Sequence, residues 1–343
     1  MAFGRKRAPL VLSMLALLMA VVCSVPAGAQ QPVNPTAESV NEQQLFQQGP
    51  IIRGRGTIPD IKSYNLEQPA GRDWRHFHEV TLRWVGGISI LGMLALLLVF
   101  YLFRGMVRID AGRDGRRLVR FSGFERFIHW TTATCFVLLA LTGLNITFGK
   151  ELLMPLIGQD AFAAWAQWAK YIHNYLSFPF SLGVVTICLM WIAWNIPDRG
   201  DIRWLEEGGG IVGHKHPPAD RFNAGQKAVY WIVVLGGAAM AASGYVLMLP
   251  FFGTDIARMQ DAQMVHAIAA VLFFAVMIAH AYIGTIGMEG AIEAMWDGTV
   301  DVNWAKEHHS LWYQKEKERG HVARPSQDAR PPGTPPGRME PAE

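Results

Sequence analysis

The chain has 343 residues, of which 51% are hydrophobic and 17% are charged, and its formal net charge is +3. Soluble domains usually carry roughly 25% charged residues. The composition therefore excludes an ordinary cytoplasmic enzyme, a disordered protein and a nucleic-acid-binding protein. The 12 Trp, 18 Phe and 8 Tyr favour a membrane protein, because aromatic rings collect at the membrane interface. The three cysteines form no disulfide framework or metal-ligand spacing, and no CxxCH motif is present.

The N-terminus has the three parts of a secretory signal peptide, which we assign to residues 1–29. A basic start at 5–7 precedes an apolar stretch at 10–25 and the small residues Ala27-Gly28-Ala29. Whether this segment is cleaved or remains as an anchor, residue 31 reaches the same side of the membrane. Residues 30–83 are polar and contain no stretch long enough to cross a bilayer, so they are predicted to form a periplasmic extension.

Five apolar stretches follow, each about the 20 residues that a helix needs to cross a bilayer. They cover residues 84–103, 128–148, 172–196, 228–250 and 265–287. We expect an all-α membrane protein whose four-helix core at 128–290 is preceded by one extra transmembrane helix at 84–103. Residues 104–127 are then a cytoplasmic loop and 291–343 a cytoplasmic tail. The segment AFAAWAQWAK at 161–170 predicts a short helix along the outer interface.

The distribution of Lys and Arg predicts the orientation. With residue 31 outside, the three inner segments hold nineteen of these residues and the three outer segments hold nine. Short cytoplasmic loops carry the excess of positive charge. The mature N-terminus is therefore expected in the periplasm and the C-terminus in the cytoplasm of a bacterial inner membrane.

Four of the eleven histidines fall at or inside the apolar stretches, namely His129, His173, His266 and His280. An ionisable side chain there is costly and marks a functional-site hypothesis. The other seven lie in loops or extensions, where solvent exposure is expected. The topology sorts the four into two depths, with His129 and His280 near the cytoplasm and His173 and His266 near the outer face.

The spacing on the last span suits two stacked cofactors. His266 and His280 are 14 residues apart, which puts them within about 40° of one helix face and about 21 Å apart along the axis. This predicts two haems, each held between two histidines and therefore closed to other ligands, as in electron carriers. Gly143, 14 residues after His129, either admits a porphyrin or allows helix contact. Zinc fits less well, because it requires four ligands at one point.

The loop before the fourth span offers parts for a quinone headgroup. It reads RFNAGQK at 221–227, with the carboxamides of Asn223 and Gln226 around Gly225. The residues alone favour the simpler interpretation, in which Asn223 caps the next helix.

Several motifs together resemble the gamma subunit of membrane-bound formate dehydrogenase, a four-span di-haem cytochrome b. They run from Arg126 to about Lys317 and include RFIHW at 126–130, LTG at 141–143, IH at 172–173, NIPDRGDIRWL at 195–205, FNAGQK at 222–227, VHAIAA at 265–270, IAHAYI at 278–283 and WAKEHHSLWY at 304–313. The chain departs from the family in its leader, its extension and its extra helix.

The resemblance implies two b haems with the same histidine pairs, His129 with His280 and His173 with His266. It also implies a quinone site beside the inner haem, formed by Asn223, Gly225, Gln226 and His280, and so favours binding over capping. The implied partners are an iron-sulfur (beta) subunit and a molybdenum or tungsten catalytic (alpha) subunit, besides quinone and membrane lipid.

We therefore expect an electron-transfer subunit that anchors a formate dehydrogenase and passes electrons from the periplasmic iron-sulfur subunit through two haems to quinone. Formate oxidation itself would occur in another subunit. The nearest alternative is the cytochrome b subunit of a hydrogenase or a thiosulfate reductase-type complex, which shares the ligand arrangement. A transporter or proton channel that uses the histidines as a relay is disfavoured, because the spans carry almost no acidic residues to continue it.

Overall fold

The computed structural model describes residues 69–210, 215–249 and 255–322. The expected signal peptide, most of the expected periplasmic extension and the end of the expected C-terminal tail lie outside these ranges. The elements, in chain order, are α4 (Pro69–His76), the π-helix η2 (Phe77–Thr81), α5 (Leu82–Arg104), β1 (Arg117–Val119), α6 (Gly123–Leu152), α7 (Met154–Ile157), α8 (Gln159–Trp191), η3 (Ile192–Trp194), α9 (Arg199–Glu206), η4 (Gly208–Gly210), α10 (Ala224–Met248), α11 (Ile256–Tyr282), the π-helix η5 (Ile283–Gly287), α12 (Glu293–Trp296), β2 (Thr299–Asp301), α13 (Val302–His308) and α14 (Ser310–Glu318).

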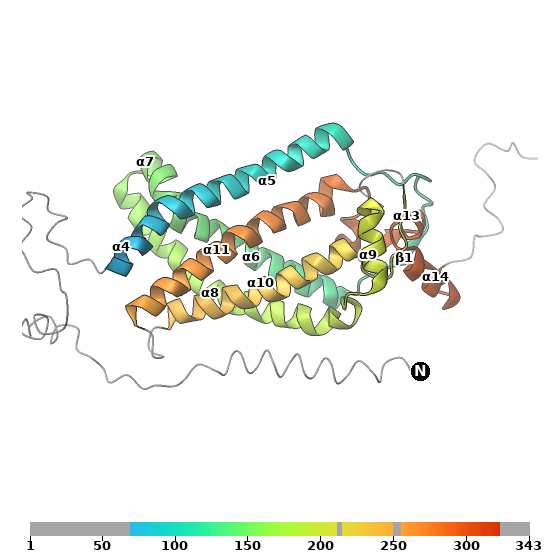
Figure 1. Cartoon of the computed structure of the whole chain (residues 1–343). Coiled ribbons are helices and arrows are strands. Elements are labelled where there is room, and N and C mark those ends of the chain that lie inside the picture. Colours follow the sequence, from blue (N-terminus) through green and yellow to red (C-terminus); the bar gives the residue numbers. More distant parts are fainter. Residues whose placement is uncertain (1–68, 211–214, 250–254, 323–343) are drawn as a thin grey trace, which may run out of the picture.

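Among the described residues, five helical segments are long and apolar enough to cross a membrane, and each overlaps one of the expected stretches. The segments at 159–194 and 224–248 end two residues before the stretches expected there. They lie side by side along one axis, with α4 and α7 at one end and α9, α13 and α14 at the other (Figure 1). We call the α7 end outer and the α13 end inner, after the predicted topology. The expected all-α fold with an extra first helix is confirmed.

Polar side chains cap the starts of three core helices, α6, α10 and α11. Ser122 accepts a hydrogen bond from the backbone N–H of Glu125 at 3.3 Å, and the Glu125 carboxylate accepts one from the N–H of Ser122 at 2.8 Å. Asp255 caps α11 by accepting from the N–H of Arg258 at 2.8 Å. These bonds satisfy backbone donors that a helix leaves free at its start.

Glycines bring the core helices close together. A Cβ on Gly183 of α8 would lie 2.1 Å from the Thr132 hydroxyl of α6, and one on Gly237 of α10 would lie 2.9 Å from Val184 of α8. Small residues give membrane helices close contact where no hydrophobic effect drives them together. The outward faces carry exposed apolar side chains, as expected of surfaces in lipid.

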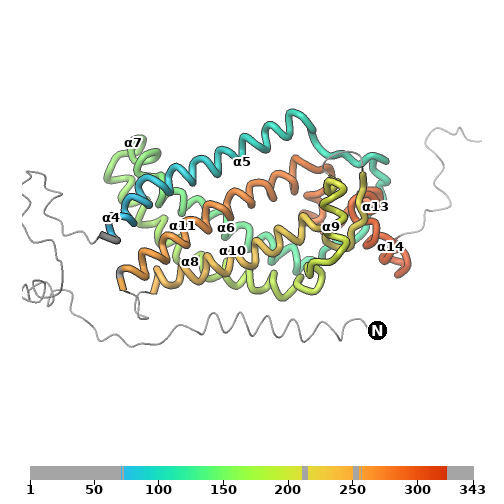
Figure 2. Tube along the Cα trace, in the orientation of Figure 1, coloured from blue at the N-terminus to red at the C-terminus, as the bar shows by residue number. Residues whose placement is uncertain are grey.

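The extra helix α5 packs along α11 (Figure 2). Its span begins earlier than expected, because α4 and η2 continue into it without a break from Asp73. Near the outer end the Arg83 guanidinium pairs with the Glu151 carboxylate at 2.8 Å. Near the inner end the rings of Phe100 and Tyr282 meet edge to face at 6.3 Å. The helix is therefore attached to the core at both ends.

The start of α8 corrects one expectation. The segment at 161–170 does not form a separate interfacial helix, because α8 runs unbroken from Gln159 to Trp191. No helix-breaking residue separates the segment from the span, and the one internal proline, Pro179, lies well inside the apolar part. Trp168 at 65% exposure still presents an aromatic ring at this end.

The inner end is a packed polar-and-aromatic subdomain, which the sequence did not predict. Strand β1 pairs antiparallel with β2, joining Leu118 to Val300. Both side chains are buried, together with Trp304 of α13 and Trp312 of α14. The first thirty or so residues of the expected cytoplasmic tail are thus part of the fold.

Candidate functional site

The inner histidine pair joins α6 to α11. The ring centres of His129 and His280 are 6.3 Å apart, with their planes at 62°. The Nδ1 of His129 is buried and has no hydrogen-bond partner among the described residues. An unsatisfied buried nitrogen costs about 1–3 kcal/mol. A ligand or hydrogen-bond partner bound at this pair would remove that cost.

The outer pair joins α8 to α11 and has the same geometry. The ring centres of His173 and His266 are 6.2 Å apart, with their planes at 68°. The two pairs predicted from depth are thus the two pairs that the fold brings together.

Hydroxyl groups hold both rings of the outer pair. The Nδ1 of His173 lies 2.8 Å from Thr142 Oγ1, and the Nδ1 of His266 lies 3.0 Å from Ser243 Oγ. Each hydroxyl also donates to a carbonyl of its own helix, Thr142 to Leu138 at 2.8 Å and Ser243 to Ala239 at 2.6 Å. A hydroxyl has one proton, so we assign it to the carbonyl and the N–H to Nδ1 of each ring. This tautomer leaves both Nε2 atoms free to bind a metal.

The spacing of both pairs fits two imidazoles on opposite sides of one metal ion. A metal–imidazole bond is about 2.0–2.1 Å and the ring centre lies about 1.1 Å beyond the nitrogen, which puts two such centres about 6.2 Å apart. The observed distances are 6.3 and 6.2 Å. No group of three or more His, Cys, Asp or Glu that could hold a metal ion exists within the described ranges. Two ligands per site suit a haem, which supplies its other four ligands itself.

Glycines lie against the outer pair on both flanking helices. A Cβ on Gly143 of α6 would be 3.6 Å from His173 Cε1, and a Cβ on Gly244 of α10 would be 3.2 Å from His266 Cε1. Each glycine directly follows the hydroxyl residue that holds the ring, in the pairs Thr142-Gly143 and Ser243-Gly244. Of these four residues, the sequence pointed only to Gly143, and Thr142, Ser243 and Gly244 were missed. The hydroxyl–glycine pair that occurs twice is the signal that could have identified them.

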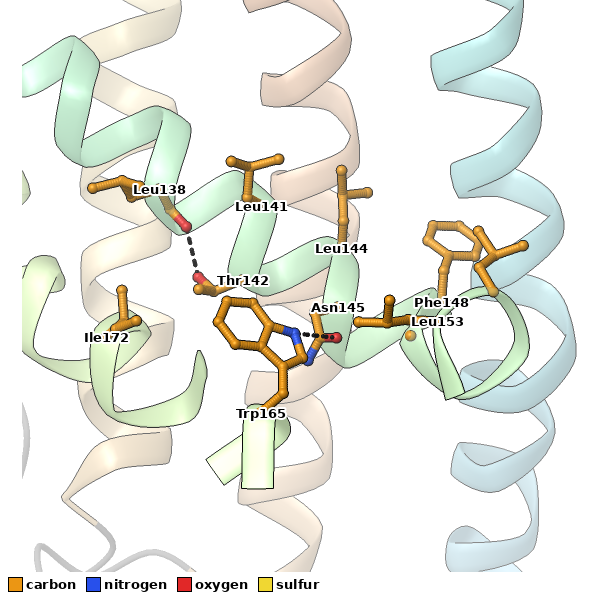
Figure 3. A pocket seen from close by; sticks show the side chains of 11 residues that line it. Leu138, Leu141, Thr142, Leu144, Asn145, Phe148, Leu153, Trp165 and Ile172 are labelled. Carbon is orange, nitrogen blue, oxygen red and sulfur yellow. Dashed lines mark hydrogen bonds between the residues drawn. The ribbon is translucent and has the colours of Figure 1, made fainter. Parts of the chain in front are cut away.

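An apolar pocket adjoins the outer pair between α6 and the start of α8 (Figure 3). Its volume is about 440 Å³, and Thr142 and Ile172 are among the side chains that line it. Its main polar group is satisfied, since the Trp165 indole donates to Asn145 Oδ1 at 3.0 Å. The apolar walls of the pocket therefore extend to Thr142, the residue that holds the His173 ring.

The loop residues Asn223, Gly225 and Gln226 stand at the start of α10. Asn223 Oδ1 accepts from the Gln226 N–H at 2.9 Å, and Gln226 Oε1 accepts from the Asn223 N–H at 3.2 Å. Capping, the simpler interpretation, is therefore present. Because it engages both carboxamide oxygens, each amide nitrogen is left without a partner among the described residues and remains a donor.

Gly225 does not open a space in this structure. A Cβ there would lie 3.1 Å from the Trp204 indole of α9, which covers the glycine. Helix α9 is fixed to α10 by Lys227, whose ammonium donates to Asp198 at 3.0 Å and to Asp201 at 2.8 Å. The carboxamides therefore lie in a rigid corner between α9 and α10.

Two histidines expected to be exposed are buried. His308 is 8% exposed and His309 is fully buried, because α13 and α14 pack onto the strands of the inner end. Burial lowers the pKa of His308 to about 4 and that of His309 well below its usual range. His214 lies outside the described residues.

Comparison with known proteins finds a matching family and several similar proteins. A family described as prokaryotic cytochrome b561 matches residues 120–298. The formate dehydrogenase cytochrome b556(fdo) subunit of Escherichia coli K12 is 31% identical over 202 residues, covering 58% of this chain and 92% of the relative. The nitrate-inducible formate dehydrogenase cytochrome b556(Fdn) subunit of the same strain is 26% identical over 219 residues, covering 62% and 97%.

A third relative, the formate dehydrogenase cytochrome b556 subunit of Haemophilus influenzae, is 27% identical over 220 residues and covers 62% of this chain and 88% of itself. The matched region contains both histidine pairs, whereas the expected leader and the whole of the extra helix α5 precede the family match. The chain therefore belongs to the prokaryotic cytochrome b561 family, among the cytochrome b subunits of formate dehydrogenases.

Proposed function

We propose that the chain is the di-haem membrane subunit of a formate dehydrogenase and carries electrons inward to a quinone. The observation that carries this proposal is the presence of two histidine pairs, whose members on α11 are 14 residues apart, with ring spacings of 6.3 and 6.2 Å. Each pair would hold one b haem, which would supply one-electron transfer.

The chain's own residues would fix these carriers at two depths. Thr142 and Ser243 orient the outer imidazoles through Nδ1, which keeps the metal-binding nitrogens pointing between the helices. The close contact of Gly183 with Thr132 keeps the helices that carry the ligands at a fixed distance. Rigid ligand positions suit electron transfer, because they leave little to rearrange when an electron arrives.

At the inner end, Asn223 and Gln226 would donate hydrogen bonds to a quinone headgroup. Their oxygens are engaged in the cap of α10, so their amide nitrogens point outward from it as donors. Quinone reduction to quinol takes two electrons from the inner carrier and two protons from the cytoplasmic water. His280 would belong to both sites, as a ligand of the inner haem and as a neighbour of the quinone.

The direction of transfer would couple the reaction to the membrane potential. With the periplasm positive, each electron moved inward works against about 2.3 kcal/mol per 100 mV. Proton uptake at the cytoplasmic side then conserves energy from a strongly reducing donor. The orientation rests on the positive-inside count, with the mature N-terminus in the periplasm of the bacterial inner membrane and the C-terminus in the cytoplasm.

The partners proposed are an iron-sulfur subunit at the outer face and a molybdenum or tungsten subunit that oxidises formate. The names of the relatives support association with formate dehydrogenase subunits. Affinity purification of the tagged chain from membranes would test this, because recovery of hydrogenase or thiosulfate reductase subunits instead would contradict it.

The haem assignment is tested by spectroscopy on the purified chain. We expect a b-type reduced-minus-oxidised spectrum and, by pyridine haemochrome, two haems per chain. His266→Ala and His129→Ala should each lose one haem, whereas His76→Ala on α4 should lose none. Retention of both haems in either ligand variant would contradict the model.

A further inference from the structure

A completely enclosed arginine lies at the inner end, beside the proposed quinone corner. Arg120, between β1 and α6, is 4% exposed. One of its terminal nitrogens donates to the Arg221 carbonyl at 2.7 Å and to His309 Nε2 at 3.1 Å, and reaches Gln226 Oε1 at 3.5 Å. Its guanidinium also packs over the rings of Trp304 and Trp312, at 5.2 and 5.0 Å.

The charge of Arg120 has no carboxylate partner among the described residues. Its neighbour Glu125 is engaged elsewhere, accepting from Arg221 at 2.7 Å and from the Trp191 indole at 2.8 Å. The other terminal nitrogen of Arg120 is buried and unbonded within the described part of the chain. Burial, with Arg221 nearby, lowers the pKa of Arg120 to about 9, so the group stays protonated at neutral pH.

His309 binds Arg120 without neutralising its positive charge. The arginine can only donate, so His309 Nε2 accepts, and its Nδ1–H donates to the Asp220 carbonyl at 2.7 Å. The groups that face His309 are Arg120, His308, the Asp220 carbonyl and the two tryptophans. None of these groups carries a negative charge and His309 is held neutral, so no group in contact with His309 neutralises the Arg120 guanidinium.

Gln226 is the link from this charge to the proposed site. Its oxygen faces both the Asn223 N–H and the guanidinium, which fixes the carboxamide with its nitrogen pointing away from them. The start of α10 adds the partial positive charge of a helix N-terminus. A headgroup oxygen bonded to the Gln226 amide would thus sit in a positive potential, which stabilises negative charge as electrons arrive.

We propose that Arg120 is a positioning residue for quinone reduction, acting through Gln226 and through its uncompensated charge. The inference rests on the proposed function, because it presumes that a quinone binds at Asn223 and Gln226. Two electrons and two protons convert the quinone to quinol, and Arg120 itself neither gains nor loses a proton.

The test uses the whole purified complex, with short-chain ubiquinone and menaquinone analogues as acceptors. We expect Arg120→Gln to lower kcat about tenfold at pH 7 with a smaller change in KM, while both haems are retained. Lowering the pH should reduce this loss of kcat, because earlier protonation of the quinone replaces the stabilising positive charge of Arg120. Arg117→Gln on β1 is the matched control, because it removes an arginine that is already paired with Glu293 and Asp297.

Arg120→Lys provides a second measurement if the glutamine variant does not assemble. It keeps the charge but loses the terminal nitrogen that reaches His309 and Gln226, so kcat should stay within about threefold while KM rises. Unchanged kcat and KM in both variants, or a Lys variant with the same kcat as the Gln variant, would overturn the proposal. If the unmodified complex reduces neither analogue, the proposed function fails first and for a separate reason.

Discussion

The Nδ1 of His173 on α8 lies 2.8 Å from the hydroxyl of Thr142 on α6. This bond crosses from one core helix to the next and fixes which ring nitrogen carries the proton. Ser243 on α10 does the same for His266 at 3.0 Å. The outer pair is therefore supported by all the core helices, two that carry the imidazoles and two that carry the hydroxyls.

The first prediction concerns this hydrogen bond. Thr142→Val keeps the side-chain shape but removes the acceptor for the His173 N–H, so the ring loses its fixed orientation. Loss of such a partner typically weakens metal binding about 10–100-fold. We expect reduced haem content after purification, with the inner haem retained, as measured by pyridine haemochrome. Thr186→Val on α8 is the control, since its exposed hydroxyl bonds only the Leu182 carbonyl. Equal haem content in the two variants would refute the role of Thr142.

The histidine pairs could be predicted from the sequence because helix rise and span direction fix depth. The position of each histidine along its span therefore predicted the pairs His129 with His280 and His173 with His266, without knowledge of how the helices pack. Thr142 and Ser243 could not be singled out in the same way, because hydroxyls in membrane helices commonly bond their own helix carbonyls. Their second bond, to an imidazole on another helix, depends on the packing.

The inner end was the part that sequence patterns did not reveal. Arg120 and His309 are 189 positions apart and meet only because β1 and β2 pair. Strands of three residues give too short a pattern to detect, and WAKEHH reads as an exposed polar segment. The burial of His308 and His309 is thus a consequence of tertiary structure, which overrides local polarity.

The second prediction concerns the contact between α6 and α8. Gly183→Ala would place a Cβ 2.1 Å from Thr132 Oγ1 and 3.1 Å from its Cβ, so one of the helices must shift. Overpacking of this kind costs about 1–3 kcal/mol. We expect a lower midpoint of thermal unfolding in detergent. Gly92→Ala on α5, which would meet nothing within 4 Å, should leave the midpoint unchanged.

The third prediction is a pH dependence at the inner end. Asp301 is buried and accepts hydrogen bonds from the N–H groups of Gly115 at 2.9 Å and Asn303 at 2.8 Å. Burial alone would raise the pKa of this carboxyl, but the backbone donors outweigh it and hold the pKa below its usual range. A depressed pKa means that the ionised form stabilises the fold above the unfolded value of about 3.9 and that this stability is lost as pH falls further.

Asp301→Asn should therefore destabilise the protein by about 1–3 kcal/mol at neutral pH, since three backbone donors, the N–H groups of Asp114, Gly115 and Asn303, lose a charged acceptor. The difference from the unmodified protein should shrink as the pH falls below about 4, toward the lowered pKa of the folded state. Thermal unfolding at a series of pH values checks this. A difference that stays constant across the series would show that the carboxylate charge is not the cause.

The last prediction concerns the extra helix. A Cβ on Gly86 would lie 3.2 Å from Phe148 of α6 and 3.5 Å from Val271 of α11, so α5 sits directly on the core at this glycine. Gly86→Leu should force α5 outward and lower the unfolding midpoint. Gly87→Leu, where a Cβ would meet nothing within 4 Å, should be tolerated because the added side chain faces lipid. Both variants should retain two haems, because no residue of α5 belongs to either histidine pair. Loss of a haem in Gly86→Leu alone would show instead that α5 is needed to keep α11, which carries His266 and His280, in place.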